Sequence, residues 1–323
     1  MRGPISVAAV RTVVGAVALA TALAGCSSGG SDGSGTPDPP RDGATAEASA
    51  EESAEDTTGV DRDSSDTYLA LGDSYTAAPM VGSTTDVADG CFRSTENYPA
   101  LVAKQLSLEL IDVSCSGATT GDLLRPQVTM TGTTLPPQLD ALSSDTDLVT
   151  ISLGGNDAGL FANLVRGCGT ERSPDPSAAP CTAADLAGGE SSVRRTMQQT
   201  RQRLVAGIEA VHRRAPDAQV VVVGYPQIAP ARGACAELPV APRDAAFARQ
   251  VNEQLTQQLE AAAAAADADY VDVFAATEGH DLCSDDPWIA DGSVRPPDAA
   301  PYHPLAAEQR AVADLLVDLV GSG

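Results

Sequence analysis

The stretch AQVVVVG, residues 218–224, places four consecutive valines before a glycine. A short, continuous apolar run without polar alternation is typical of a strand that is buried on both faces, as in a parallel sheet. Four other short runs have the same character, at residues 68–71, 108–113, 148–153 and 270–274. The sequence therefore predicts five buried strands.

Helical patterns separate these runs. Apolar residues recur near helical spacing between Val193 and Val211, again in the Ala-rich segment 242–266, and in the last segment, 305–320. Alternating strands and helices favour a parallel sheet with helices on both faces. We expect one α/β domain over residues 67–323, a three-layer α/β/α sandwich around a central parallel five-stranded sheet. Long insertions are expected near 75–97, 158–190 and 281–302.

The composition limits the class of protein. The chain has 323 residues, 43% of them hydrophobic, which is enough for a sizeable core. Its 44 acidic residues outnumber 20 Lys and Arg, giving a net charge of −24. Nucleic-acid binding needs clustered positive charge, so we expect no nucleic-acid partner. No apolar stretch approaches the roughly 18 residues of a membrane-spanning helix, which argues against a polytopic membrane protein.

The N-terminus has the pattern of an export signal. Arg2 and Arg11 precede or flank an apolar run over residues 13–24, and Gly25 and Cys26 follow it. Small residues before this cysteine resemble a bacterial lipobox. The resemblance implies a lipoprotein signal peptide over 1–25, a lipidated Cys26, and a protein held at the outer face of the cell membrane. The alternative is an ordinary secretory peptide; either way the chain is expected to be exported.

Residues 26–66 form an acidic tract with little to bury. Between residues 32 and 66 there are 11 acidic residues against two arginines, a net charge of −9. Low hydrophobicity with high net charge predicts disorder, so we interpret the tract as a linker between anchor and domain. A glycosylated stalk is the alternative.

Four polar motifs stand after apolar runs or before the last helix. Ser74 follows the first predicted strand in Gly-Asp-Ser, Gly117 follows the second, and Asn156 follows the third in Gly-Gly-Asn-Asp. His303 precedes the last predicted helix. Active sites in open parallel sheets form at the carboxyl ends of strands, which is where the first three fall. Each motif alone is also common turn or helix-cap chemistry.

Taken together and in this order, the four motifs resemble those of the SGNH hydrolases, the GDSL-type esterases and lipases. The resemblance covers nearly all of residues 67–321 and is strongest to the secreted actinobacterial branch with three disulfides. It implies that Ser74 is the nucleophile and His303 the general base. It also implies a flavodoxin-like SGNH hydrolase fold and an oxyanion hole formed by the N–H groups of Ser74 and Gly117 and the amide of Asn156. The sequence shows no cofactor requirement, and we expect no metal.

One position departs from the broader family. Many members carry Asp three residues before the histidine, where this chain has Ala300. Asp298 lies five residues before His303, with Pro301 between them. Some members of the secreted branch replace the acid with a backbone carbonyl, and we expect a carbonyl of Ala300 or a neighbour to orient His303.

Seven cysteines leave six beyond Cys26, and an exported chain meets an oxidising compartment. Six cysteines allow 15 pairings. A metal site is the rival interpretation, but the chain has no Cys-x-x-Cys pair and three histidines in all. The family resemblance implies three bridges in sequence order, Cys91–Cys115, Cys168–Cys181 and Cys235–Cys283.

Three other residues have side chains that often occur in functional sites, but we expect each of them to have another role. His212 ends a predicted helix and is expected to be solvated, while His280 is expected to be structural. The single tryptophan, Trp288, lies in the segment leading to His303, and we expect it to pack that segment rather than contact substrate.

The function predicted from these residues is hydrolysis of a carboxylic ester, by an esterase or lipase. One alternative is a polysaccharide O-acetyl esterase; another is a surface-binding lipoprotein without catalysis. The expected partners are an ester or lipid substrate and the membrane, and the protein is expected to be a monomer. The sequence does not define the acyl chain length or the natural substrate.

Overall fold

A computed structural model of the protein describes residues 66–168, 175, 177–293 and 298–321. The predicted signal peptide, the lipidation of Cys26 and nearly all of the acidic linker lie outside these residues. Across the described ranges, no helix combines the length and the hydrophobicity needed to cross a membrane.

A parallel sheet of five strands forms the centre of the domain and confirms the predicted fold. Its strands are β1 (Thr67–Gly72), β2 (Glu109–Asp112), β5 (Leu148–Ser152), β6 (Gln219–Val223) and β7 (Asp269–Val271). Their order across the sheet is β2-β1-β5-β6-β7, and every neighbouring pair is parallel. The chain therefore starts near the middle and is wound outward in both directions. As a result, β1 and β5 present adjacent carboxyl ends.

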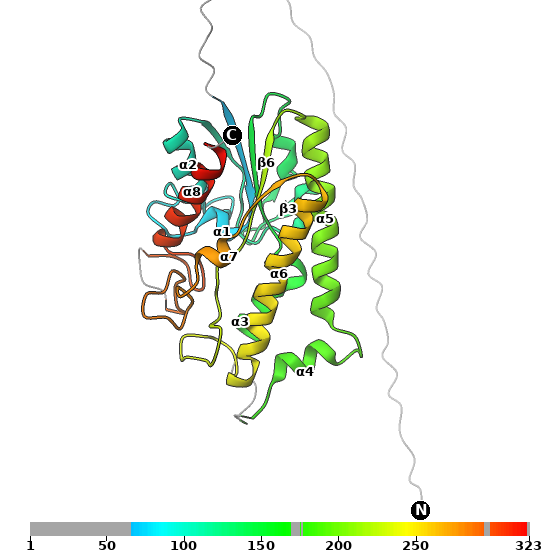
Figure 1. Ribbon diagram of the computed structural model, residues 1–323, viewed down its shortest axis with the longest axis vertical. Helices are drawn as coiled ribbons and strands as arrows, with labels where there is room; N and C mark the ends of the chain where they lie inside the picture. The colour runs from blue at the N-terminus through cyan, green and yellow to red at the C-terminus, as the bar shows by residue number, and fades with distance from the viewer. Residues whose placement is uncertain (1–65, 169–174, 176, 294–297, 322–323) are drawn as a thin grey trace, which may run out of the picture. The chain divides into compact units, whose positions relative to one another are not determined.

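Helices cover both faces of this sheet, as Figure 1 shows. Helices α2 (Tyr98–Leu106) and α8 (Ala306–Val320) pack against one face. The long helices α5 (Ser192–Arg214) and α6 (Ala245–Ala265) lie side by side against the other face. Along β1 the side chains of Tyr68 and Ala70 enter the first layer and those of Leu69 and Leu71 the second. This alternation explains why the strand sequence is apolar throughout.

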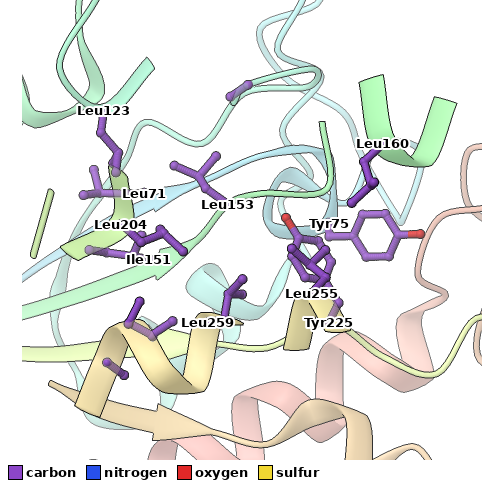
Figure 2. Close-up of a cluster of buried hydrophobic side chains, with 14 of the residues drawn as sticks. Leu71, Tyr75, Leu123, Ile151, Leu153, Leu160, Leu204, Tyr225, Leu255 and Leu259 are labelled. Carbon is purple, nitrogen blue, oxygen red and sulfur yellow. The ribbon is translucent and has the colours of Figure 1, made fainter. Parts of the chain in front are cut away.

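The larger core lies between the sheet and the pair α5 and α6. Figure 2 shows part of it, with Leu71 and Ile151 from the strands and Leu204 and Leu255 from the helices. These four side chains are fully buried, and each contributes about 1.5–3 kcal/mol to folding by leaving water. Tyr75 and Tyr225 belong to the same cluster, so the core continues to the ends of β1 and β6.

The last predicted strand is shorter than expected. It ends at Val271, and residues 273–276 form a helical turn, α7 (Val273–Ala276), instead of continuing the strand to Phe274. The carboxylate of Asp272 accepts a hydrogen bond from the N–H of Ala275 and caps this turn. Apolar periodicity could not separate these states over so short a run.

The long insertions and the other loops between the main elements contain short elements that the sequence did not define. The helices are α1 (Ser74–Ala77), α3 (Leu160–Gly167) and α4 (Pro180–Leu186). Short 3₁₀ turns are η1 (Thr120–Leu123), η2 (Gln138–Ala141), η3 (Asp157–Gly159) and η5 (Pro242–Asp244). A two-stranded antiparallel sheet joins β3 (Gln127–Val128) and β4 (Thr134–Leu135).

Three disulfides close these insertions in the structure. They are Cys91–Cys115, Cys168–Cys181 and Cys235–Cys283. The bridges join residues that are 24, 13 and 48 positions apart. Closing loops of this length typically stabilises a domain by about 2–4 kcal/mol.

Candidate active site

Ser74 lies at the carboxyl end of β1, where the strand turns into the short helix α1. The Asp73 side chain caps this helix, because its Oδ1 accepts a hydrogen bond from the N–H of Tyr75 at 2.8 Å. Gln138 holds the preceding residue: its amide accepts from the Gly72 N–H and donates to the Gly72 carbonyl, both at 2.9 Å. The backbone around Ser74 is therefore fixed on both sides.

Asp73 is also the centre of a buried hydrogen-bond network. Its Oδ2 accepts from the hydroxyl of Tyr225 at 2.6 Å, and that hydroxyl accepts from the N–H of Gly155 at 2.9 Å. These contacts connect the ends of β1, β5 and β6. Burial raises the pKa of Asp73 to about 7, although the hydrogen bonds from Tyr225 and Tyr75 oppose that rise.

Asn156 extends this network toward the cavity. Its Nδ2 donates to the carbonyl of Ala118 at 3.0 Å and more weakly to Asp73 Oδ2 at 3.4 Å. The amide is thereby placed between the loops that follow β2 and β5. The N–H in the longer contact could exchange Asp73 for a developing negative charge on a substrate.

The sequence motifs also contain two backbone N–H groups that could bind a ligand, those of Ser74 and Gly117. Gly117 has φ +81°, a conformation that favours glycine, and a Cβ there would meet no atom within 4 Å. The N–H groups of Ser116 and Ala118 bond to carbonyls. Within the described parts of the chain, the N–H groups of Gly117 and Ser74 have no such partner. Two donors are therefore available to a ligand.

Asp157 fastens the loops that carry Gly117 and Asn156. Its carboxylate accepts from the Thr120 N–H at 2.8 Å and from the hydroxyls of Thr120 and Thr200 at 2.5 and 2.7 Å. Arg203 of α5 lies 3.6 Å away. Asp157 is thus engaged by structural contacts, and it positions its neighbour Asn156.

His303 is held by backbone groups rather than by a carboxylate. Its Nδ1 lies 2.8 Å from the carbonyl oxygen of Pro301, a neighbour of Ala300. This contact makes Nδ1 the protonated nitrogen and leaves Nε2 with a lone pair. Burial lowers the pKa of His303, so the ring stays neutral. The side chain of Asp298 is exposed and forms no hydrogen bond within the described segments.

Tyr75 connects the segment of His303 to that of Ser74. Its hydroxyl donates to the carbonyl of Tyr302 at 2.8 Å, and its ring centroid lies 5.5 Å from that of His303. Tyr302 has φ +63°, which a non-glycine residue adopts at a cost. The backbone turn that presents His303 is therefore held against Tyr75 by a specific contact.

Ser74, Asn156 and His303 line the same cavity, which has a volume of about 350 Å³. Gly117 is not among the residues that line it. The walls away from Ser74 are mainly apolar and come from α3, α6, the loop after β6 and the segment after α7. They include Phe161, Leu164, Val165, Ile228, Leu238, Val240, Ala248 and Leu282. The cavity thus combines a polar end with an apolar interior.

Residues 70–311 match the sequence profile of the GDSL-like lipase/acylhydrolase family. The chain belongs to this family. It is 34% identical to Lipase 2 of Streptomyces coelicolor over 264 residues, covering 79% of this chain and 85% of that protein. Over 243 residues it is 34% identical to a lipase of Streptomyces rimosus, covering 75% and 82% of the two chains.

Solved structures agree with this assignment. The crystal structure of the extracellular lipase from Streptomyces rimosus has a TM-score of 0.64 at 32% identity, over 79% of this chain and 99% of that chain. A phospholipase A1 from Streptomyces albidoflavus has a TM-score of 0.58 at 29% identity, again over 79% and 99%. As a member of the GDSL-like family, the protein is a serine ester hydrolase.

Several residues of this GDSL-like hydrolase were not identified from the sequence. Tyr225 follows Val-Val-Val-Val-Gly and could have been found as a polar group at a strand end. Tyr75 stands directly after Ser74. Gln138 lies in the segment between β2 and β5, and no local signal distinguishes its side chain, which pairs with Gly72.

The remaining candidates lie outside the cavity. His212 is partly buried rather than solvated, because its ring lies 3.0 Å from the Ala266 carbonyl. His280 stacks on Trp288 with ring centroids 3.7 Å apart, and its Nδ1 lies 2.8 Å from the Asp286 carbonyl. Trp288 therefore packs its own segment, as expected, and does not line the cavity.

Proposed function

We propose that Ser74 and His303 carry out ester hydrolysis through an acyl-enzyme. The Ser74 Oγ bonds to the ester carbonyl carbon while its proton moves to Nε2 of His303. The tetrahedral intermediate then expels the alcohol, whose oxygen takes that proton from Nε2. Water attacks the acyl-enzyme by the same route, releasing the carboxylic acid and restoring the Ser74 hydroxyl.

The oxyanion formed in each step is assigned to three donors, the N–H groups of Ser74 and Gly117 and the amide of Asn156. The observation that carries the proposal is that Ser74, Asn156 and His303 border one cavity, with His303 Nδ1 bonded at 2.8 Å to the Pro301 carbonyl. Such a bond fixes the tautomer and the orientation of the ring, which is the role of the acid in a triad. A backbone carbonyl can perform that role without a carboxylate.

The proposed substrate is an ester with an apolar acyl group. Phe161, Leu164, Val240 and Leu282 give the cavity interior a surface that favours hydrocarbon over a sugar. The similar proteins are a lipase and a phospholipase A1, which agrees with an acyl chain in this position. We therefore place lipid esters ahead of acetylated polysaccharides.

The proposal also includes an exported, membrane-anchored monomer. The assigned parts are a signal peptide at 1–25, a lipidated Cys26 with an acidic linker at 26–66, and the hydrolase domain at 67–323. The similar lipase from Streptomyces rimosus is described as extracellular, and three disulfides suit an oxidising compartment.

The experiment is hydrolysis of p-nitrophenyl esters from C2 to C16 by the purified protein, with Ser74→Ala and His303→Ala alongside. We expect turnover by the wild type, a preference for longer chains than acetyl, and background rates in both variants. Ser83→Ala is a matched control, because it removes an exposed serine hydroxyl that does not line the cavity. A folded wild-type protein that hydrolyses no ester in the series would contradict the proposal.

A further inference from the structure

A second hollow lies between the outer surfaces of α5 and α6, with a volume of about 510 Å³. It is separate from the active cavity, because different sides of α6 line the two. Ala248 and Asn252 face the active cavity, whereas Gln254 and Gln257 border the second hollow, which we call the α5–α6 groove. Any ligand in the groove would be divided from Ser74 by the body of α6.

The polar side chains of the α5–α6 groove have no partners in the described part of the protein. The lining consists of Arg194, Arg201, Met197 and five glutamines. No hydrogen bond or ion pair from these guanidinium groups or amides to a described residue is present. Met197 is 2% exposed and closes the floor. The groove thus presents two cations and five amides to the outside.

The unpaired state of Arg194 and Arg201 distinguishes them from the other arginines of α5. This helix carries six arginines and a single acid, Glu209, in a chain with a net charge of −24. Arg195 and Arg213 form ion pairs with Glu190 and Glu209, Arg203 lies near Asp157, and Arg214 donates to the Leu142 carbonyl. The two arginines without such contacts are the two that line the groove.

We propose that the α5–α6 groove binds a hydroxyl-rich chain that carries spaced anionic groups, phosphate or carboxylate. Arginine recognises both anions through paired N–H donors. Arg194 and Arg201 are seven residues apart, so they stand about 10 Å apart along one face of the helix. Glutamine amides both donate and accept, as hydroxyl groups require. The groove has five amides and two cations, so a ligand that fits it would carry more neutral polar groups than charged groups.

Charge complementarity and shape favour such a chain over an anionic membrane. A membrane surface binds best to a convex cationic face with apolar side chains at its edge. The groove is hollow, its one apolar residue is buried, and amides surround it. The strongly negative remainder of the protein would also be repelled by a flat anionic surface, whereas a single chain contacts the groove alone.

The test measures binding of the full chain to carboxymethyl-dextran and dextran phosphate, with neutral dextran and polyglutamate as comparison polymers. At about 0.15 M salt, where charges are screened beyond roughly 8 Å, distant acidic residues contribute little. We expect binding to one or both anionic dextrans and much weaker binding to the other two polymers. Binding to dextran phosphate alone, or to carboxymethyl-dextran alone, identifies the anion and supports the groove.

The decisive variant is Arg194→Gln with Arg201→Gln. Its matched control is Arg195→Gln with Arg213→Gln, which changes the charge of the same helix equally outside the groove. We expect at least tenfold weaker binding in the first and less than twofold change in the second. Equal losses in both would overturn the proposal, because they would indicate general charge attraction. So would polyglutamate binding as tightly as the dextrans, since it carries no hydroxyl groups.

Ester hydrolysis separates this proposal from the catalytic one. Hydrolysis of a soluble p-nitrophenyl ester should be unchanged in the Arg194→Gln, Arg201→Gln variant. Conversely, Ser74→Ala should bind the anionic dextrans as the wild type does. Loss of polymer binding in Ser74→Ala would contradict a groove that acts independently of the active cavity.

Discussion

Ser74 and His303 border the same cavity, but the protein holds them by different kinds of contact. Around Ser74 the contacts come from buried side chains, with Asp73 bonded to Tyr225 at 2.6 Å and Gln138 paired with Gly72. The polar contacts of His303 itself come from the backbone, while the Tyr75 hydroxyl holds the neighbouring Tyr302 carbonyl. The carbonyl of His303 accepts from the Ala290 N–H, its N–H donates to the Ala300 carbonyl, and its ring bonds to the Pro301 carbonyl.

This difference decides which substitutions should affect each half of the active site, the half that holds Ser74 and the half that holds His303. Side-chain contacts are removed by single substitutions, so the Ser74 half is sensitive to mutations at residues that never touch substrate. Backbone contacts survive most substitutions, so the His303 half should tolerate changes at its acidic residues.

Asn156→Ala should give the largest effect short of removing Ser74 or His303. Loss of one oxyanion donor should lower kcat about 100- to 1,000-fold, with little change in KM. Steady-state kinetics on a C8 ester measures it. Asn163→Ala is the control, since that exposed amide bonds to the Ala158 carbonyl outside the cavity. Similar kinetics in the two variants would remove Asn156 from the oxyanion hole.

Glu308→Gln tests the contact that joins the two halves. Gln309 of α8 donates to the Tyr75 carbonyl at 3.0 Å and to Glu308 at 2.7 Å. Burial raises the pKa of Glu308 to about 8, so the folded protein keeps a proton that the unfolded chain releases near its ordinary pKa of 4.5. Wild-type stability should therefore fall as the pH rises from 4.5 to 8, by roughly 1.4 kcal/mol per pH unit.

The variant lacks this ionisation, so its advantage over the wild type should grow across that window and become constant above pH 8. Urea unfolding of both proteins at pH 5, 6.5, 8 and 9 measures the difference. A difference that does not change with pH would show that Glu308 is ionised in the folded protein throughout.

Tyr225→Phe should have a smaller effect on stability and a distinctive effect on activity. Removing the hydroxyl leaves the Gly155 N–H without a partner and takes the 2.6 Å hydrogen bond from Asp73 Oδ2, which costs about 1–3 kcal/mol of unfolding free energy. Tyr225 donates to the Asp73 carboxylate and so opposes the rise in the pKa of Asp73 that burial causes. Without this donor the pKa of Asp73 should rise further above 7. As the pH is lowered, the Asp73 carboxylate should then become protonated, and activity should be lost, at a higher pH than in the wild type.

The matched control is Tyr68→Phe. Its hydroxyl is equally buried and bonds to Thr150 at 2.8 Å in the opposite core layer. This variant should lose stability without shifting the pH profile of kcat. Identical pH profiles for Tyr225→Phe and the wild type would show that Tyr225 has a structural role alone.

The same contrast explains how much of the protein could be predicted from its sequence. Buried strands leave continuous apolar runs, so local patterns predict the sheet and place Ser74 and Asn156 at its strand ends. The roles of these two residues were implied by the family resemblance, because each motif alone is also common turn or helix-cap chemistry. The boundary at Asp272 was not found, because a capped turn of four residues has no period to detect. Gln138 acts on Gly72 over 66 positions, and nothing in the local sequence indicates this contact. Tyr225 stands at a strand end, but its partner Asp73 lies 152 positions away, so the sequence did not indicate which group it would contact.

Asp298→Ala should have the smallest effect and tests the other half of the comparison. If the Pro301 carbonyl alone orients His303, removing the exposed Asp298 carboxylate should change kcat by less than twofold. A carboxylate that acted as the third member of a triad would be expected to lower kcat by a factor of about 10⁴ when removed. Kinetics on the C8 ester distinguishes these values, with circular dichroism to establish that the variant is folded. A thousandfold loss would mean that Asp298 reaches His303 during catalysis, and the two halves would then both depend on side-chain charge.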